Sequence, residues 1–181
     1  MSITSIKGIY DPIAFTQTAS CGLRTLEDHL ELFGVDMDPD YQRDHVWTQE
    51  QQENFMGHLL EGGAIPDIIL NERLYSDQGG MVEYVECVDG KQRITAVLRW
   101  LKGEIGARLT GGDQVWYDKL DTDSRTILAT SIRLPFKHVR LDRAGVLRLY
   151  LRLNRGGTVH SEEEIEKVRQ LLAEEEAKVN D

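Results

Sequence analysis

Apolar residues recur at helical spacing in several segments of the chain. Leu26, Leu30 and Phe33 repeat every three or four positions, which predicts a first helix over residues 25–33. The same spacing predicts three further helices: one that begins at Thr48, one over residues 91–101, and one from Asp142 to residue 153. Each would turn one apolar face toward a core.

Polar and glycine residues predict where these helices begin and end. Thr48 and Gln51 form a capping box, in which each side chain satisfies a backbone N–H group of the first turn. Gly62 and Gly63 are predicted to end that helix, because glycine tolerates the left-handed backbone of a C-cap. The same signals mark three later boundaries: Asp142 as an N-cap, Gly156 and Gly157 as a stop, and a Ser161–Glu164 capping box that starts a charged helix over residues 161–179.

Period-two alternation predicts the strands. Residues 81–88 alternate and contain strand-favouring valine and tyrosine, which predicts a strand there. Shorter strands are predicted at residues 67–70, opened by Pro66, and at 132–139. Loops are predicted at residues 34–47, in the polar stretch between 70 and 81, and at 103–115, and short helical turns are predicted around Tyr117 and at 124–130. Short strands with intervening helices predict a single α+β domain.

The expected organisation has three parts. The first twenty residues are polar and weakly patterned, so residues 1–23 are predicted to be an N-terminal extension. Residues 24–160 are predicted to form the domain, and residues 161–181 a charged C-terminal helix. A length of 181 residues is enough to bury a core of this kind.

Composition excludes several classes of protein. No apolar run approaches the roughly 20 residues that span a bilayer, and the N-terminus lacks the layout of a secretory signal. The two cysteines, Cys21 and Cys87, provide neither a disulfide framework nor a thiolate metal cluster. We therefore expect a cytoplasmic protein of a bacterial cell or a phage-infected host, with no membrane partner.

Charge is distributed unevenly. The net charge of −10 argues against a protein whose whole surface binds nucleic acid. Residues 133–155, however, contain seven basic residues and one acid, whereas residues 162–181 contain eight acids and three bases. The basic segment makes Lys137, Arg140 and Arg143 the candidate nucleic-acid contacts. The alternative interpretation is a solvated helix face.

The segment Asp89-Gly90-Lys91-Gln92-Arg93 stands where a predicted strand turns into a predicted helix. Backbone N–H groups at a helix N-terminus bind anions, and Gly90 allows a phosphate to approach the backbone closely. Lys91 and Arg93 add positive charge. Asp89 is the candidate Mg²⁺ ligand or general base, and Gln92 can position the acceptor. The alternative is a helix cap at Asp89 with both cations in solvent.

Two further segments carry candidate binding residues. Tyr41-Gln42-Arg43 offers an aromatic ring that can stack on a base and a guanidinium group that can bind a phosphate. Asn154 and Arg155 precede a glycine-rich turn that offers backbone donors. The ordinary interpretations are an exposed loop for the first segment and a helix C-cap for the second.

Four ordered motifs give the chain a family resemblance. They are Tyr-Gln-Arg-x3-Trp at residues 41–47, Gly-Gly-Ala-Ile-Pro-Asp-Ile at 62–68, Val-Asp-Gly-Lys-Gln-Arg-Ile-Thr-Ala at 88–96, and Arg-Leu-Asn-Arg-Gly-Gly-Thr at 152–158. Together they resemble the DGQQR-motif domain of GmrSD-type modification-dependent restriction enzymes, a member of the ParB/sulfiredoxin-like superfamily. The resemblance covers residues 24–166.

This resemblance implies a ParB/sulfiredoxin-like fold that binds a nucleoside triphosphate (ATP, GTP or CTP) with Mg²⁺ and cleaves or transfers its phosphate. Asp89, Gly90, Gln92 and Arg93 match the motif, whereas Lys91 replaces its usual glutamine. The five histidines show no spacing suited to a metal or to the HNH nuclease domain of these enzymes. A nuclease or other protein partner, or a homodimer, is therefore expected.

Three functions follow as hypotheses. The first is an NTPase or NTP-dependent phosphotransferase (kinase) that acts on a hydroxyl group, with modified DNA as a candidate substrate, in DNA modification or restriction. The second is a ParB-like nuclease that cuts DNA directly. The third is a non-catalytic module whose nucleotide controls the binding of DNA or protein. The superfamily alone does not select among them.

Overall fold

The computed structural model describes residues 13–42, 47–77, 80–154 and 162–178. Its elements, in chain order, are β1 (Gln17–Gly22), the 3₁₀ turn η1 (Leu23–Thr25), α1 (Leu26–Leu32), β2 (Val35–Asp36), α2 (Gln49–Leu60), β3 (Ile68–Asp77), β4 (Gly80–Asp89), α3 (Lys91–Leu101), β5 (Ala107–Arg108), β6 (Gln114–Val115), the 3₁₀ turn η2 (Tyr117–Lys119), α4 (Thr122–Ser131), β7 (Arg133–Val139), α5 (Arg143–Leu153) and α6 (Glu162–Lys178).

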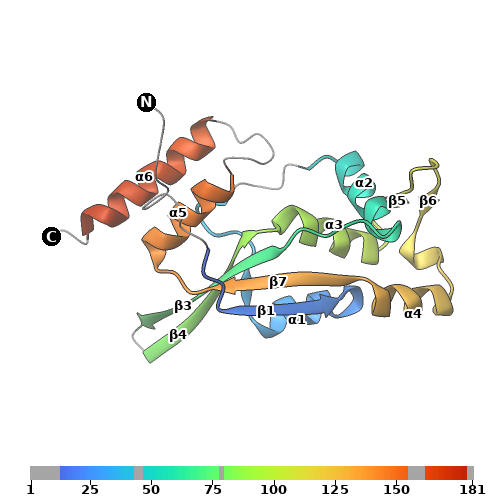
Figure 1. The fold of residues 1–181 in the computed structure, drawn as a ribbon, viewed down its shortest axis with the longest axis horizontal. Coiled ribbons are helices and arrows are strands. Elements are labelled where there is room, and N and C mark those ends of the chain that lie inside the picture. The colour runs from blue at the N-terminus through green and yellow to red at the C-terminus, as the bar shows by residue number, and fades with distance from the viewer. Residues whose placement is uncertain (1–12, 43–46, 78–79, 155–161, 179–181) are drawn as a thin grey trace, which may run out of the picture.

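A five-stranded mixed sheet, in the order β1-β7-β3-β4-β2, organises the molecule. Strands β1 and β7 pair antiparallel, as do β3 and β4, whereas β7 with β3 and β4 with β2 pair parallel. Strands β3 and β4 run on together as a hairpin beyond the rest of the sheet (Figure 1). Strands and helices in this mixture confirm the predicted α+β class.

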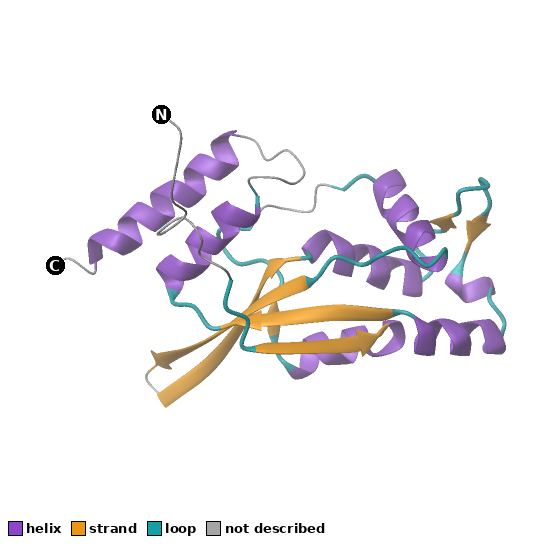
Figure 2. Cartoon of the chain, in the orientation of Figure 1, coloured by secondary structure: helices purple, strands orange, loops and turns teal. Residues whose placement is uncertain are grey.

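Both faces of the sheet are buried, each in its own apolar cluster. Ile68 and Leu70 pack in the larger cluster with residues of α1, α2 and α3. Ile69, whose side chain points the opposite way, packs in the second cluster with residues of α5 and α6. Figure 2 shows α5 and α6 at one end of the molecule, away from α2 and α4.

Local sequence signals are confirmed where they were strongest. Helix α3 has the predicted bounds, and Thr48 and Gln51 form the predicted capping box at the start of α2. The Asp142 side chain accepts a hydrogen bond from the Gly145 backbone N–H, so Asp142 is the N-cap of α5. The predicted stop at Gly156–Gly157 and the capping residue Ser161 lie outside the described residues.

Four expectations about loops and strands need correction. The strand predicted at residues 67–70 continues to Asp77, because it pairs with β4 along its length. Residues 17–22, assigned to the extension, form β1 at the edge of the sheet. The predicted loop 34–47 contains β2, and the predicted loop 103–115 contains both β5 and β6. In each segment, pairing with another strand outweighs weak local patterning.

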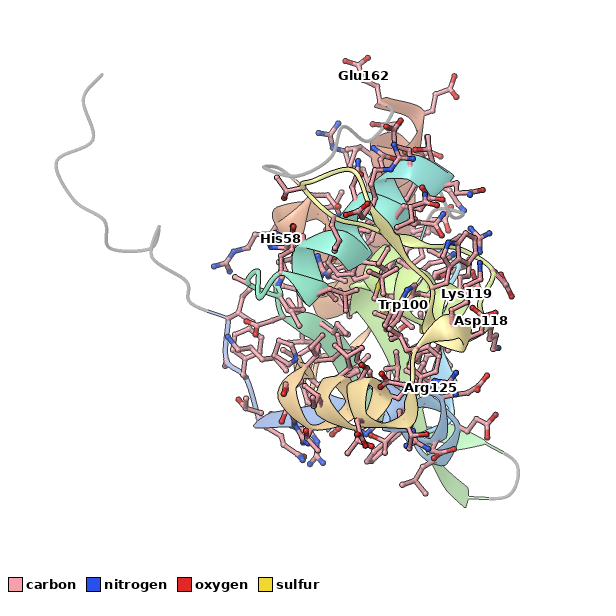
Figure 3. The ribbon with its side chains drawn as sticks, turned by 90° about the vertical axis from the view of Figure 1, so that its right-hand side faces the viewer. His58, Trp100, Asp118, Lys119, Arg125 and Glu162 are labelled. Atoms are coloured by element: carbon pink, nitrogen blue, oxygen red, sulfur yellow. The ribbon has the colours of Figure 1, made fainter. Side chains whose placement is uncertain are left out.

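The end of the molecule opposite α6 is built around Trp100. Its ring is fully buried, and its Nε1 donates a hydrogen bond to the Val115 carbonyl at 2.9 Å. In Figure 3 Trp100 lies in the interior, with Asp118, Lys119 and Arg125 toward the outside. The Arg125 guanidinium lies over the Tyr117 ring, 5.3 Å from its centroid. These contacts hold the short β5–β6 hairpin and η2 against α3.

The buried Glu53 side chain also supports this end. Its carboxylate accepts hydrogen bonds from Gln49 (2.7 Å), Arg108 (2.9 Å) and Gln114 (3.1 Å). Burial by itself would raise the pKa of Glu53. The hydrogen bonds from Gln49 and Arg108 and the charge of Arg108 outweigh burial, so that pKa lies below its ordinary value.

The substitution Glu53→Gln should weaken the acid sensitivity of the fold. A folded-state pKa below the ordinary value of 4.5 means that ionised Glu53 stabilises the protein above that pH. This stabilisation is lost as the pH falls through the folded-state pKa. Urea denaturation from about pH 6 to about pH 3 should therefore show a smaller loss of unfolding free energy in the variant than in wild type. Equal losses would contradict this role for Glu53.

Candidate functional site

The turn from β4 into α3 is tight enough to require glycine. Gly90 lies between Asp89 and Lys91 with φ of +114°, in the left-handed region that L side chains rarely adopt. A Cβ atom on Gly90 would lie 2.9 Å from Cγ1 of Ile68 on β3. The backbone of this turn therefore lies directly against the neighbouring strand.

Helix α3 begins immediately after this turn. The backbone N–H of Ile94 donates to the Gly90 carbonyl at 2.9 Å, which is the first hydrogen bond of the helix. The N–H groups of the three preceding residues have no acceptor within the helix, and they carry the positive end of its dipole. The start of α3 therefore has the charge and the donors that an anion needs.

Arg93 is fixed beside the carboxylate of Asp89. Its Nη2 donates to Asp89 Oδ2 and to the Asp67 backbone carbonyl, both at 3.0 Å. The Arg93 side chain is 15% exposed and that of Asp89 is 45% exposed. Among the described residues, Arg93 Nε is buried without a hydrogen-bond partner. Asp89 and Arg93, two of the predicted site residues, are thus close together, with a carboxylate that solvent reaches and a guanidinium that is held in place.

The ammonium group of Lys91 is directed toward a loop carboxylate. Lys91 Nζ lies 2.5 Å from Asp38 Oδ1, and its side chain is only 10% exposed. The sequence places Lys91 beside the phosphates of a ligand. In the structure the lysine makes an ion pair with Asp38, which is not among the predicted site residues. The contact of Lys91 with a phosphate stays a prediction.

Residues 36–42, named here the acidic strap, join three elements around the site. Its aspartates alternate along the chain, and each contacts a different element: Asp36 accepts a hydrogen bond from Tyr84 of β4, Asp38 pairs with Lys91 of α3, and Asp40 pairs with Arg143 of α5 at 2.5 Å. The Asp-x-Asp-x-Asp spacing was the sequence signal for these residues. It could not reveal their partners, which are distant in sequence.

The strap is anchored by Tyr41 and Gln42. Tyr41 is 2% exposed, and its ring centroid lies 5.1 Å from that of Tyr150. Burial, followed by the nearby charge of Glu86, raises the pKa of Tyr41 above its ordinary value. Gln42 Nε2 donates to the carbonyls of Cys87 (2.7 Å) and Val88 (3.1 Å) at the end of β4. The expected stacking of Tyr41 on a base is corrected, because its ring belongs to the core.

Gln92 connects the start of α3 to the segment before α2. Its Oε1 accepts a hydrogen bond from the Trp47 backbone N–H at 3.1 Å. Trp47 in turn packs edge-on against Phe55 of α2, with 5.3 Å between ring centroids. The predicted phosphate contact Arg43 lies outside the described residues, between the strap and Trp47.

The third predicted segment is described only in part. Asn154 Nδ2 donates to the Tyr150 carbonyl at 2.8 Å, so this side chain caps the end of α5. Tyr150, one helical turn earlier, contacts Tyr41 of the strap. The end of α5 therefore lies beside the strap, while Arg155 lies outside the described residues.

Each of the three candidate nucleic-acid contacts forms an ion pair with an acidic residue, which offsets its positive charge. The pairs are Lys137 with Asp67 at 2.6 Å, Arg140 with Glu72 at 3.2 Å, and Arg143 with Asp40 at 2.5 Å. Phosphate binding releases counterions only where cationic charge is available. These three residues therefore form a surface with much less net positive charge than the sequence indicates.

Cys87 lies on β4 just before the site, but its thiol is not a candidate nucleophile. Burial raises the pKa of Cys87 to about 12. A thiol with that pKa stays protonated and unreactive near neutral pH. In the described ranges, no group of three or more histidine, cysteine, aspartate or glutamate residues is placed to hold a metal ion. No helix in the same ranges is long and apolar enough to cross a membrane.

Comparisons with known proteins agree with the motifs. Residues 26–140 match the family described as the N-terminal domain of the GmrSD restriction endonuclease. No curated protein matches the chain. The chain is also similar to the crystal structure of the C-terminally truncated chromosome-partitioning protein ParB from Caulobacter crescentus complexed with CTP-gamma-S, with 16% sequence identity and a TM-score of 0.40.

The similarity to ParB covers 88% of this chain and 64% of that chain, so this chain spans a little under two thirds of its length. That TM-score is too low for the ligand of ParB to be assigned to this protein. The family match is more informative than the similarity to ParB, because residues 26–140 include the first three of the four motifs. The fourth motif, at residues 152–158, lies beyond the matched residues.

Proposed function

The chain belongs to the family of GmrSD restriction endonuclease N-terminal domains. From that premise we propose that it binds a nucleoside triphosphate at the start of α3 and hydrolyses it, or transfers its terminal phosphate to a hydroxyl group. The process served is DNA modification or restriction, in the cytoplasm, with DNA as substrate or activator.

The observation that carries this proposal is the arrangement of Asp89, Gly90 and Arg93. A glycine turn with φ of +114° leads into the start of α3, and an ion pair of 3.0 Å stands beside it. A polyphosphate at this position would meet backbone N–H groups and a positioned guanidinium group. Those are the groups that phosphoryl transfer needs for binding and charge stabilisation.

Each residue then has a distinct role. Asp89 orients the attacking oxygen or accepts its proton, Arg93 stabilises the charge of the phosphoryl group, and Gln92 positions the acceptor. An oxygen of water or of a hydroxyl group attacks the terminal phosphorus. The bond to the bridging oxygen breaks, and the nucleoside diphosphate leaves with the electron pair.

The side chains present fit a nucleotide-borne Mg²⁺ better than a resident metal ion. Mg²⁺ commonly binds through one or two carboxylates, with phosphate oxygens and water completing its shell. Asp89 is the carboxylate that would hold it, since its side chain is 45% exposed. When bound, the ion would neutralise charge on the phosphate oxygens.

Labelled ATP, GTP and CTP, incubated with the protein and Mg²⁺, with and without plain or base-modified DNA, test the proposal. Free labelled phosphate identifies an NTPase, and label on DNA identifies a kinase that uses DNA. Nucleotide recovered intact in every mixture would exclude phosphoryl transfer. Broken DNA would instead identify the nuclease, which the paired basic residues of the described segment disfavour.

A second candidate is a nucleotide-controlled binding module without turnover. The contacts of the acidic strap favour it, because the strap joins α3 to β4 and α5 through Asp38, Gln42 and Asp40. A ligand that alters one of these contacts can change the surface offered to DNA, to a nuclease partner or to a second copy of the chain. Retained, intact nucleotide with altered partner binding would identify this function.

A further inference from the structure

We propose that Asp38 of the acidic strap is an intramolecular competitor for the phosphate of the nucleotide, which must displace it from Lys91 in order to bind. The inference rests on the proposed function, because it concerns regulation of the same site. It states that the nucleotide-free protein is self-inhibited through one ion pair, and that nucleotide binding moves the strap.

The two partners of this ion pair differ in their access to water. The Lys91 side chain is 10% exposed, whereas that of Asp38 is 74% exposed, with 2.5 Å between their charged atoms. A buried ammonium group needs an anion, because losing its partner leaves a desolvated charge. The exposed carboxylate can leave at low cost, since water solvates it at once. A phosphate group can therefore replace Asp38 and keep Lys91 paired.

The rest of the strap stays anchored while Asp38 moves. Before it, Asp36 accepts hydrogen bonds from Tyr84 and from the Asp38 backbone N–H. After it, Asp40 binds Arg143, and Gln42 binds the Cys87 and Val88 carbonyls. Because Tyr41 is also buried, release of Asp38 is a local change between two fixed points and not an unfolding of the loop.

Competition of this kind lowers apparent affinity without changing the contacts of the bound state. The measured Kd equals the intrinsic Kd divided by the fraction of molecules in which Lys91 is available. A carboxylate that holds Lys91 most of the time therefore weakens nucleotide binding by a measurable factor. Lys91 replaces the glutamine of the related motif. The lysine and Asp38 would therefore together regulate nucleotide binding in a way that the glutamine of the usual motif does not.

Isothermal titration calorimetry of the 181-residue chain with ATP, GTP and CTP tests the inference. Asp38→Asn should bind nucleotide about two- to fivefold more tightly than wild type, the range expected for loss of one competing ion pair. Asp40→Asn is the matched control, because it removes the same charge from the same strap but leaves Lys91 paired. Its affinity should change much less than that of Asp38→Asn, because Lys91 keeps its carboxylate partner. Equal tightening by both variants would show general loosening of the strap and overturn the proposal.

The Lys91→Gln background provides the second test. If Asp38 acts through Lys91, adding Asp38→Asn to Lys91→Gln should leave nucleotide affinity unchanged. An equal gain in both backgrounds would overturn the proposal. Asp38→Ser is the replacement variant if Asp38→Asn does not fold. If wild type binds nucleotide and Asp38→Asn binds it no more tightly, this inference alone is wrong. If no variant binds nucleotide, the proposed function and the inference are both wrong.

Discussion

Replacing Asp89 with alanine is expected to lower the rate of nucleotide turnover at least about a hundredfold, because a positioned acid or base contributes about that much or more to catalysis. The fold should survive. Arg93 would keep its hydrogen bond to the Asp67 carbonyl, and the Asp89 side chain is 45% exposed, so loss of this ion pair should cost only about 1–3 kcal/mol of stability. Release of labelled phosphate from ATP, GTP and CTP, with circular dichroism of the same samples, measures both effects.

Asp67→Ala is the local control for this substitution. The Asp67 carboxylate binds Lys137 at 2.6 Å, and only its backbone carbonyl contacts Arg93. Turnover should therefore persist in Asp67→Ala. Asp89→Asn removes the negative charge but keeps the shape of the side chain, and it should be as inactive as the alanine variant. Unchanged phosphate release in either Asp89 variant would remove Asp89 from the mechanism.

Gly90→Ala should be the most destabilising small substitution near the site. A residue with φ of +114° is strained for any L side chain, and the added Cβ would lie within 3.2 Å of three Ile68 atoms. Backbone strain and overpacking together should cost about 2–5 kcal/mol of unfolding free energy. Urea denaturation measures this loss. Nucleotide affinity should fall as well, because the strand and the helix start must separate.

Gly62→Ala isolates the strain from the steric clash. Gly62 also has a positive φ, +82°, but a Cβ atom there would meet nothing within 4 Å. Its cost should therefore be only about 1–2 kcal/mol, from backbone strain. If the two alanine variants lost equal stability, close packing of Gly90 on Ile68 would not explain the requirement for glycine.

The elements that local sequence predicted well share one property: their determinants lie within a few residues. The Thr48 capping box joins residues three apart, and its two hydrogen bonds are present at the start of α2. Asp142 caps α5 in the same way. Helix α3 has an apolar face at helical spacing, so its bounds could be predicted without knowing its neighbours.

Strand β3 shows where local reasoning was insufficient. Its last seven residues, 71–77, are mostly polar and have no distinct alternation, and they were predicted to be part of a loop. The residues form a strand because β4 supplies a complete antiparallel partner. Asn71 and Glu72 are buried there and satisfied by Glu86 and His138 across neighbouring strands. Polar burial of this kind depends on partners, so composition alone predicts exposure.

The sequence by itself determined the position of the candidate site, since Asp89, Gly90 and Arg93 lie within five residues and the strand–helix transition is a local feature. It also determined the family, through motifs whose order along the chain is visible without a structure. Only the tertiary structure decided which partners the cationic and aromatic side chains contact. Lys91 meets Asp38 across 53 residues, Arg143 meets Asp40 across 103, and Tyr41 enters the core beside Tyr150. Charge and aromaticity are properties of single residues, but their partners are set by how distant segments fold together.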